Sequence, residues 1–92
     1  MITADQKKTI KRILKSYHTA KAGVFGSYAR GNQNPDSDLD LIVEFSRPMN
    51  LLDLIGVEQE LTDALGIKVD LLTFESIHKS IRPYVEKEVK YL

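Results

Sequence analysis

The stretch from Asp38 to Phe45, DLDLIVEF, is the feature of this sequence that most restricts its fold. Apolar residues at positions 39, 41, 43 and 45 alternate with Asp38, Asp40, Ile42 and Glu44. Because successive side chains of a β-strand point to opposite faces, this alternation predicts a strand with one dry face. We therefore expect a sheet that other elements cover on that side.

The residues before this strand predict a helix, a strand and a short helical turn. Thr3 and Gln6 form a capping box, and apolar residues then recur at helical spacing for about four turns, so this helix should end near His18. The run AGVFG, which Gly26 closes, is typical of a buried strand followed by a tight turn. SYAR allows only a turn or two of helix before Gly31, and NQNPDS is a loop by composition.

The second half predicts a helix, a third strand and a final helical segment. Asn50 caps a helix that ends at Gly66 and has an apolar stripe of Leu51, Leu54, Leu61 and Leu65. IKVDLLTF follows as a strand, and because a whole helix separates it from residues 38–45, we expect these two strands to be parallel with a right-handed crossover.

The last segment, from Ser76 onward, is expected to be helical because apolar residues recur four apart. Pro83 marks either a break or the first turn of a last piece. The four apolar residues are Ile77, Ile81, Val85 and Val89. The predicted fold is thus an α/β (α+β) domain in the order α-β-α-β-α-β-α, with a small mixed sheet of about three strands backed by helices.

Length and composition narrow the class of protein. The 92 residues suit a single domain over 1–92, and a chain this short buries only about 60 to 65% of its unfolded surface, so we expect modest stability. Thirteen basic and thirteen acidic side chains cancel, which argues against nucleic acid as a partner. The absence of cysteine fits a reducing cytoplasm, and no apolar run approaches the roughly 20 residues of a membrane span.

Three aspartates form the candidate metal site. Asp38 and Asp40 are two residues apart on one strand, so they project from the same face with Cα atoms roughly 7 Å apart. Asp70 lies among apolar residues of the next strand, where an unpaired charge is costly, and it can join the pair if the strands are adjacent. Clustered carboxylates raise one another's proton affinity unless a cation lies between them, and Mg²⁺ prefers such oxygen ligands.

The turn after the first strand is a candidate phosphate site. Gly26 leaves room for a phosphate to approach the backbone N–H groups at a helix start. Ser27 adds a hydroxyl donor, and Arg30, one turn later, offers a bidentate fork to phosphate oxygens. Phosphate donors beside a carboxylate cluster suit the transfer of a phosphoryl or nucleotidyl group from a metal-bound triphosphate.

These motifs resemble those of the minimal nucleotidyltransferases of the DNA polymerase β superfamily. GSYARG, then SDLDLIV, then an isolated aspartate in VDLL match the family order of Gly-Ser, Arg-Gly, Asp-x-Asp and a third Asp. The resemblance implies that Asp38 and Asp40 hold two Mg²⁺ ions and that Asp70 completes one metal shell and helps to activate an acceptor hydroxyl. It also implies that Gly26 and Ser27 grip the triphosphate of a nucleotide, with ATP the preferred donor.

The resemblance also suggests a partner. Small members of this family are typically the antitoxin of HEPN/MNT toxin-antitoxin pairs, and some add AMP to a tyrosine of the HEPN toxin. Many relatives have a second arginine where this chain has Tyr28. A competing hypothesis is a binding module that neutralises its partner by occlusion with a vestigial nucleotide site, although the intact set of three aspartates argues against decay.

Simpler interpretations apply to other residues. DSDLD imitates the start of an EF-hand loop, but Leu41 and Arg47 stand where Gly and Glu are needed. Asp36 follows Pro35 and is interpreted as a turn former. The lysines of the first helix are expected to form a solvated face, and Tyr84 and Tyr91 to be packing residues. Apolar residues outside the main stripes, namely Leu52, Ile55 and Tyr91, favour a homo- or hetero-oligomer.

Overall fold

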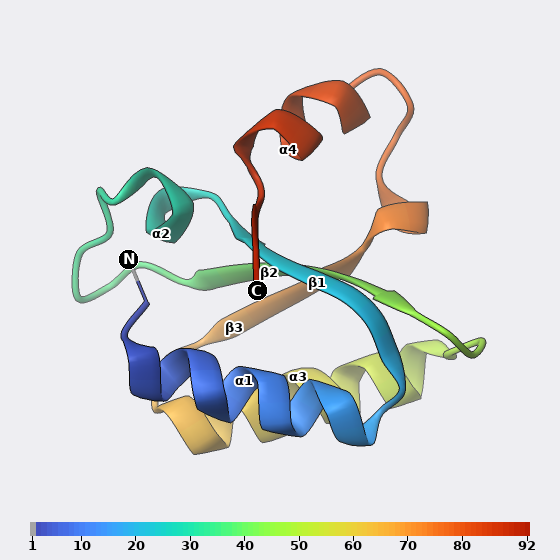
Figure 1. Cartoon of the computed structure of the whole chain (residues 1–92), viewed down its shortest axis with the longest axis horizontal. Coiled ribbons are helices and arrows are strands. Elements are labelled where there is room, and N and C mark those ends of the chain that lie inside the picture. The colour runs from blue at the N-terminus through green and yellow to red at the C-terminus, as the bar shows by residue number, and fades with distance from the viewer. Residues whose placement is uncertain (1) are drawn as a thin grey trace.

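A computed structural model describes residues 2–92 of the chain (Figure 1). Within these residues the backbone forms four α-helices, one 3₁₀ helix and a sheet of four strands. Their order is α1 (Ala4–Ser16), β1 (Thr19–Phe25), α2 (Ser27–Arg30), β2 (Leu39–Phe45), α3 (Leu51–Leu65), β3 (Val69–Thr73), η1 (Phe74–Ser76), α4 (Arg82–Glu88) and β4 (Lys90–Tyr91). The predicted mixed fold is confirmed, with β4 added to the expected strands.

The sheet has the strand order β3-β2-β1-β4. The pairing of β2 with β3 is parallel, as the helical crossover between them predicted. β1 pairs antiparallel with β2 on one side and with β4 on the other. The end of β1 therefore lies beside the start of β2, and the start of β3 lies there too, which brings three chain segments to one end of the sheet.

Helices α1 and α3 lie side by side and cover one face of the sheet (Figure 1). The alternation in β2 places Leu39, Leu41 and Val43 in the core against them, and none of these three side chains is exposed. Ile10 and Leu14 of α1 belong to the same core. The predicted apolar face of this strand is confirmed.

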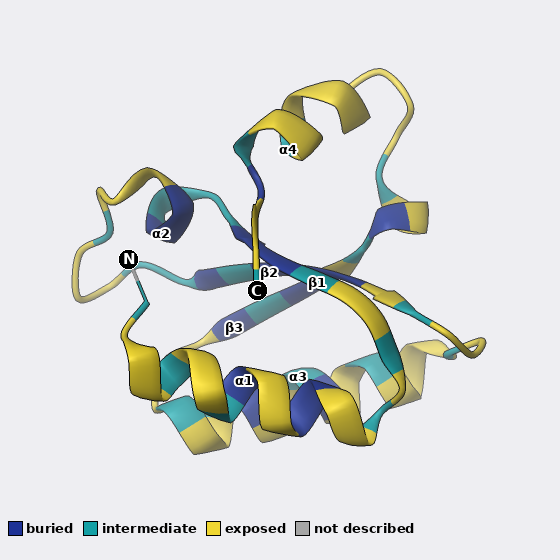
Figure 2. Ribbon diagram, in the orientation of Figure 1, coloured by how far each residue is buried: buried dark blue, intermediate teal, exposed yellow. Residues whose placement is uncertain are grey.

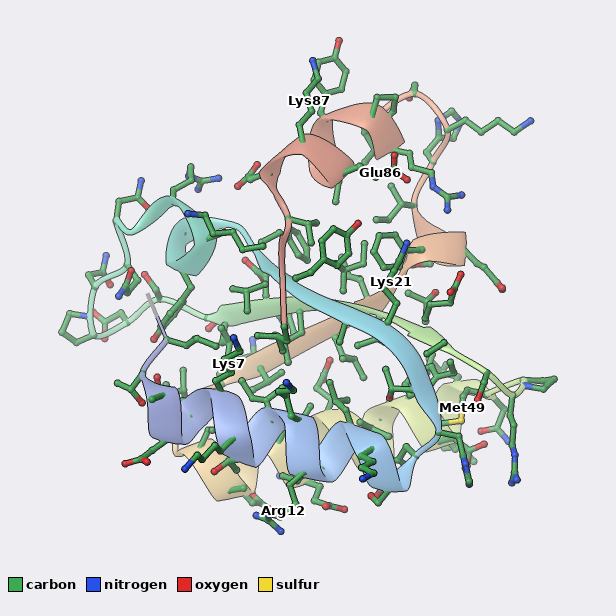
Figure 3. All side chains as sticks on the ribbon, in the orientation of Figure 1. Lys7, Arg12, Lys21, Met49, Glu86 and Lys87 are labelled. Atoms are coloured by element: carbon green, nitrogen blue, oxygen red, sulfur yellow. The ribbon has the colours of Figure 1, made fainter. Side chains whose placement is uncertain are left out.

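The opposite face has a smaller apolar cluster made of Ile42, Phe74 and Val89. β2 is therefore buried on both faces at Ile42, which differs from the single dry face expected. Lys21 reaches from β1 over the Phe74 ring, with its Nζ 4.3 Å from the ring centroid (Figure 3). Figure 2 shows that α4, above this cluster, is mostly exposed. The upper layer of the molecule is thus thin, and much of this sheet face remains open.

The helix boundaries follow local signals. Thr3 and Gln6 form both bonds of the predicted capping box of α1. The helix ends at Ser16, two residues before the expected end, because the chain reverses at His18, which has a positive φ of 59°. The predicted caps of α3 are confirmed, with Asn50 accepting from the Asp53 N–H at 2.8 Å and Gly66 in the left-handed conformation.

The carboxyl-terminal segment departs from the prediction. Residues 77–81 are not helical, α4 is limited to Arg82–Glu88, and the chain then forms β4. The four-residue spacing of apolar side chains suggested one helix, but Val89 instead packs on Ile42 and Phe74, and Tyr91 pairs with Gly23 of β1. Hydrogen bonds to a strand far away in sequence override the local helical pattern there.

The exposure of several apolar and aromatic side chains can be compared with the prediction. The apolar stripe of α3 is shifted, because Val57 and Leu61 are fully buried whereas Leu51 is 71% exposed. Tyr84 is 73% exposed, so its assignment as a packing residue was wrong. Leu52 and Ile55 are exposed as expected.

Within residues 2–92, no helix has the length and apolar character needed to cross a membrane.

Candidate active site

The sheet register brings the predicted aspartates to the same end of the sheet. Asp40 of β2 is the direct partner of Asp70 in β3, and Phe25 at the end of β1 is the partner of Asp40 on the other side. Asp38 immediately precedes β2, two residues from Asp40. Side chains at paired positions of neighbouring strands point to the same face. The three carboxylates therefore lie on the face opposite α1 and α3.

Hydrogen bonds between its backbone and side chains of α3 hold the strand that carries Asp70. Side chains of α3 bind the free edge of β3, because the Leu71 N–H donates to Glu58 Oε2 at 2.8 Å and the Val69 N–H donates to Thr62 Oγ1 at 3.1 Å. These two bonds flank Asp70 on both sides along the strand. Asp70 thus lies in an edge strand whose outer edge is held by α3.

The carboxylates of this cluster perturb one another. Burial, followed by the charges of Asp70 and Asp38, raises the pKa of the Asp40 carboxyl. Burial is also the main cause of the raised pKa of Asp70; the charge of Asp38, which lies within hydrogen-bonding reach, contributes next. Lys68 Nζ, 3.7 Å from Asp38 Oδ2, partly offsets this negative charge. The site therefore favours a bound cation, which would relieve the repulsion.

The donor set fits Mg²⁺ in its chemistry. Carboxylate oxygens are the ligands that this hard ion prefers, and it commonly keeps waters and substrate phosphates in its remaining positions. Across residues 2–92, no three His, Cys, Asp or Glu side chains are already arranged as a closed metal-binding group. Asp38 lies between two groups of opposite charge, with its Oδ2 3.7 Å from Lys68 Nζ and its carboxyl within hydrogen-bonding reach of Asp70.

The glycine turn lies against this cluster. Gly26 has φ 75° and ψ −152°, a conformation that is essentially restricted to glycine. A Cβ atom at this position would lie 2.3 Å from Asp40 Oδ2. Both the backbone conformation and the close approach of a carboxylate therefore require glycine. The predicted phosphate turn and the predicted metal ligands are thus in direct contact.

The helix after this turn is shorter than an anion-binding helix. α2 spans only Ser27–Arg30, so its dipole is small and the expected help from it is limited. The groups that could donate to an anion at the turn are instead individual ones. The Gly26 N–H and the Arg30 guanidinium both contact Glu88 Oε1, at 3.1 Å for the Gly26 N–H. Ser27 is half-buried at the start of α2.

Glu88 was not predicted as a site residue. It ends α4, 62 positions from Gly26 in the sequence, and its charge adds to those that raise the pKa of Asp40. The surrounding letters, KEVKYL, have the composition of a surface helix and contain no motif that indicates a site. Only the pairing of β4 with β1 reveals its position.

Two residues whose roles were in question lie away from the chemistry. Tyr28 is 9% exposed and belongs to the main core, so it is a packing residue. Asp36 is exposed in the loop before β2, and its N–H donates to Asn34 Oδ1 at 2.9 Å. Its interpretation as a turn residue agrees with that bond.

A mixed sheet with a glycine turn at the end of one strand and carboxylates on the next two strands of the sheet is typical of proteins that transfer nucleotidyl groups. The family model described as a nucleotidyltransferase domain matches residues 7–92, and the chain belongs to this family. The resemblance drawn from the GSYARG and SDLDLIV motifs is thereby confirmed.

Individual relatives agree with this assignment. The chain is 47% identical over 81 residues to an inferred protein adenylyltransferase of Methanocaldococcus jannaschii, covering 87% of this chain and 80% of that protein. It is 35% identical over 97 residues to the protein adenylyltransferase MntA of Thermococcus cleftensis, covering 100% and 98% of the two chains. A crystal structure of a toxin-antitoxin with AMP-PNP matches with a TM-score of 0.82 at 27% identity, covering 95% of this chain and 71% of that chain.

Proposed function

We propose that this protein transfers AMP from ATP to a tyrosine hydroxyl of a HEPN-type toxin and so acts as its antitoxin. The observation that carries the proposal is the pairing of Asp40 with Asp70, with Asp38 and the Gly26 turn beside them. Membership of the nucleotidyltransferase family supports nucleotidyl transfer. The names of the relatives support a protein acceptor and a toxin-antitoxin context.

The aspartates have the role of metal ligands in this proposal. Asp38 and Asp40 would hold two Mg²⁺ ions, and Asp70 would complete the shell of one of them. Bound Mg²⁺ supplies charge neutralisation of the triphosphate and lowers the pKa of the acceptor hydroxyl. The two raised pKa values support the assignment, because burial and then the charges of neighbouring carboxylates disfavour the ionised form of Asp40 and Asp70, and a bound cation would offset both effects.

The turn and its arginine bind the triphosphate. The Gly26 N–H donates to a phosphate oxygen, Ser27 adds its hydroxyl, and Arg30 balances charge on the leaving group. The acceptor oxygen then forms a bond to the α-phosphorus while the bond from that phosphorus to the bridging oxygen breaks, and pyrophosphate leaves. The Asp70 carboxylate accepts the hydroxyl proton and passes it to water.

The exposure of the sheet face around Asp70 supports a large acceptor. Leu72, two residues along β3 and on the same face, is 42% exposed. β3 is an edge strand, and α4 lies over the cluster of Ile42, Phe74 and Val89, on which its Val85 packs. A tyrosine on the surface of another protein can therefore approach Asp70 from the open side without passing through the core.

The test is intact-mass analysis of the co-expressed HEPN partner. We expect the partner to gain the mass of AMP with the wild-type chain and not with an Asp38→Asn, Asp40→Asn variant. A matched control replaces two exposed acidic residues, Asp5→Asn and Glu75→Gln, and should behave as the wild type.

A second function is favoured by one observation, the contact of Glu88 with the donors of the phosphate turn. In this alternative the chain neutralises its partner by occlusion alone, and its nucleotide site is vestigial. The mass experiment separates the two. A partner that is silenced equally by both chains and carries no added AMP contradicts the enzyme proposal and supports occlusion.

A further inference from the structure

One carboxylate of the chain already occupies the groups assigned to phosphate binding. Glu88 Oε1 accepts a hydrogen bond from the Gly26 N–H at 3.1 Å and forms an ion pair with the Arg30 guanidinium. A single oxygen therefore bridges a backbone donor and a cation, as a phosphate oxygen does in an anion site. Glu88 has the charge and the contacts of a bound anion.

The position of Glu88 is set by the fold. The next residue, Val89, is buried against Ile42 and Phe74, and the chain then pairs with β1 as β4. The pairing of Val24 with Lys90 places this segment two residues from Gly26 along β1. The side chain of Glu88 is 34% exposed, less than the 54% of Arg30. Its contact with the turn thus follows from the anchored backbone on its carboxyl-terminal side.

The helix that carries Glu88 can move at low cost. No residue of α4 is buried, and Figure 3 shows Lys87 pointing away from the sheet. Val85 is the residue of α4 that packs, partly buried, on the small cluster of Ile42, Phe74 and Val89. Little apolar surface is therefore exposed when α4 shifts or when the side chain of Glu88 rotates outward.

Glu88 and a triphosphate cannot use these donors together. Both are anions, and Glu88 lies near Asp40, which is itself a carboxylate of the site. We propose that Glu88 is an internal competitor of the nucleotide, which occupies the Gly26 N–H and Arg30 in the free protein and is displaced when a triphosphate binds. This inference rests on the proposed function, because it concerns the same nucleotide site.

Calorimetric titration with AMP-PNP and Mg²⁺ tests the inference on the intact chain. Glu88→Gln removes the charge while it preserves the shape, and it should tighten AMP-PNP binding about two- to fivefold, the range that a partly exposed ion pair supports. Glu88→Ala should tighten binding as well. Glu86→Gln is the matched control, because Glu86 lies on the same helix and pairs with Arg82 instead, and its affinity should equal that of the wild type.

A second measurement follows the turn itself. The amide resonance of Gly26 should shift when Glu88→Gln is introduced without nucleotide, and tripolyphosphate should shift it at lower concentration in the variant than in the wild type. Unchanged or weaker AMP-PNP binding in both Glu88 variants, with normal binding by the wild type, overturns the inference and leaves the proposed function standing. A folded wild-type chain that binds neither AMP-PNP nor tripolyphosphate overturns both.

Discussion

Replacement of Gly26 by alanine tests whether the phosphate turn and the carboxylate cluster are in contact. The backbone conformation of Gly26, φ 75° and ψ −152°, costs other residues about 1–3 kcal/mol. The new Cβ also lies 2.3 Å from Asp40 Oδ2, a distance that forces the carboxylate or the turn to move. Overpacking of this kind costs about 1–3 kcal/mol in addition. We expect a total loss in the free energy of unfolding of at least about 2 kcal/mol.

Gly31 provides the matched control. Its φ is also 75°, but its ψ of 17° is in the left-handed helical region, and nothing lies within 4 Å of a Cβ built there. Gly31→Ala should therefore cost only about 1–2 kcal/mol. Each kcal/mol lowers the Tm of a domain of this size by roughly 4–8 °C, so thermal unfolding followed by circular dichroism separates the two variants.

A double-mutant cycle assigns the difference to Asp40. In an Asp40→Ala background the two nearest contacts of the new Cβ, Oδ2 and Cγ, are absent, and the remaining Asp40 Cβ lies 3.5 Å away, an ordinary contact. Gly26→Ala should then cost less than in the wild type, with a coupling energy of about 0.5–3 kcal/mol. Equal costs of Gly26→Ala in both backgrounds, or a cost no larger than that of Gly31→Ala, would refute the reasoning.

Two further predictions concern pH and the small core. The pKa values of Asp40 and Asp70 are raised above the reference value of 3.8. Between this reference value and the raised values, the folded state therefore binds more protons than the unfolded state. The free energy of unfolding should then fall as the pH rises through this window. Asp40→Asn, Asp70→Asn should flatten this part of a urea-unfolding pH series, and an unchanged slope contradicts the assignment. Phe74→Ala should lower the free energy of unfolding by about 3–5 kcal/mol. Tyr84→Ala, at an exposed position, should change it by less than about 0.5 kcal/mol. Equal losses in the two variants would mean that Phe74 is not buried.

Local signals predicted most of the elements of this protein. The capping boxes at Thr3 and Asn50, the left-handed glycine at Gly66 and the alternation through β2 each depend on residues a few positions apart. Each of these features has the same physical meaning in any fold, because it concerns backbone groups or side-chain directions within one element. The parallel pairing of β2 and β3 followed from the length of the connection alone.

The carboxyl-terminal segment shows where local signals fail. The apolar residues from Ile77 to Val89 repeat at helical spacing. Val89 nevertheless follows the end of α4 and packs on Ile42 and Phe74, and Tyr91 pairs with β1. The residues of β1 whose backbone groups pair with β4 lie more than 60 positions before it in the sequence. A pattern within one segment contains no information about that distant edge, so a helix was predicted where a strand formed.

The sequence by itself determined which chemical groups this protein has near a turn and along a strand: a glycine, a serine, an arginine and the pair Asp38 and Asp40. Only the tertiary structure decided that Asp70 stands level with Asp40, that Tyr28 is a core residue, and that Glu88 reaches the turn. The physical reason is that spacing along one element fixes directions of side chains, whereas contact between elements depends on strand register and on packing of the whole chain.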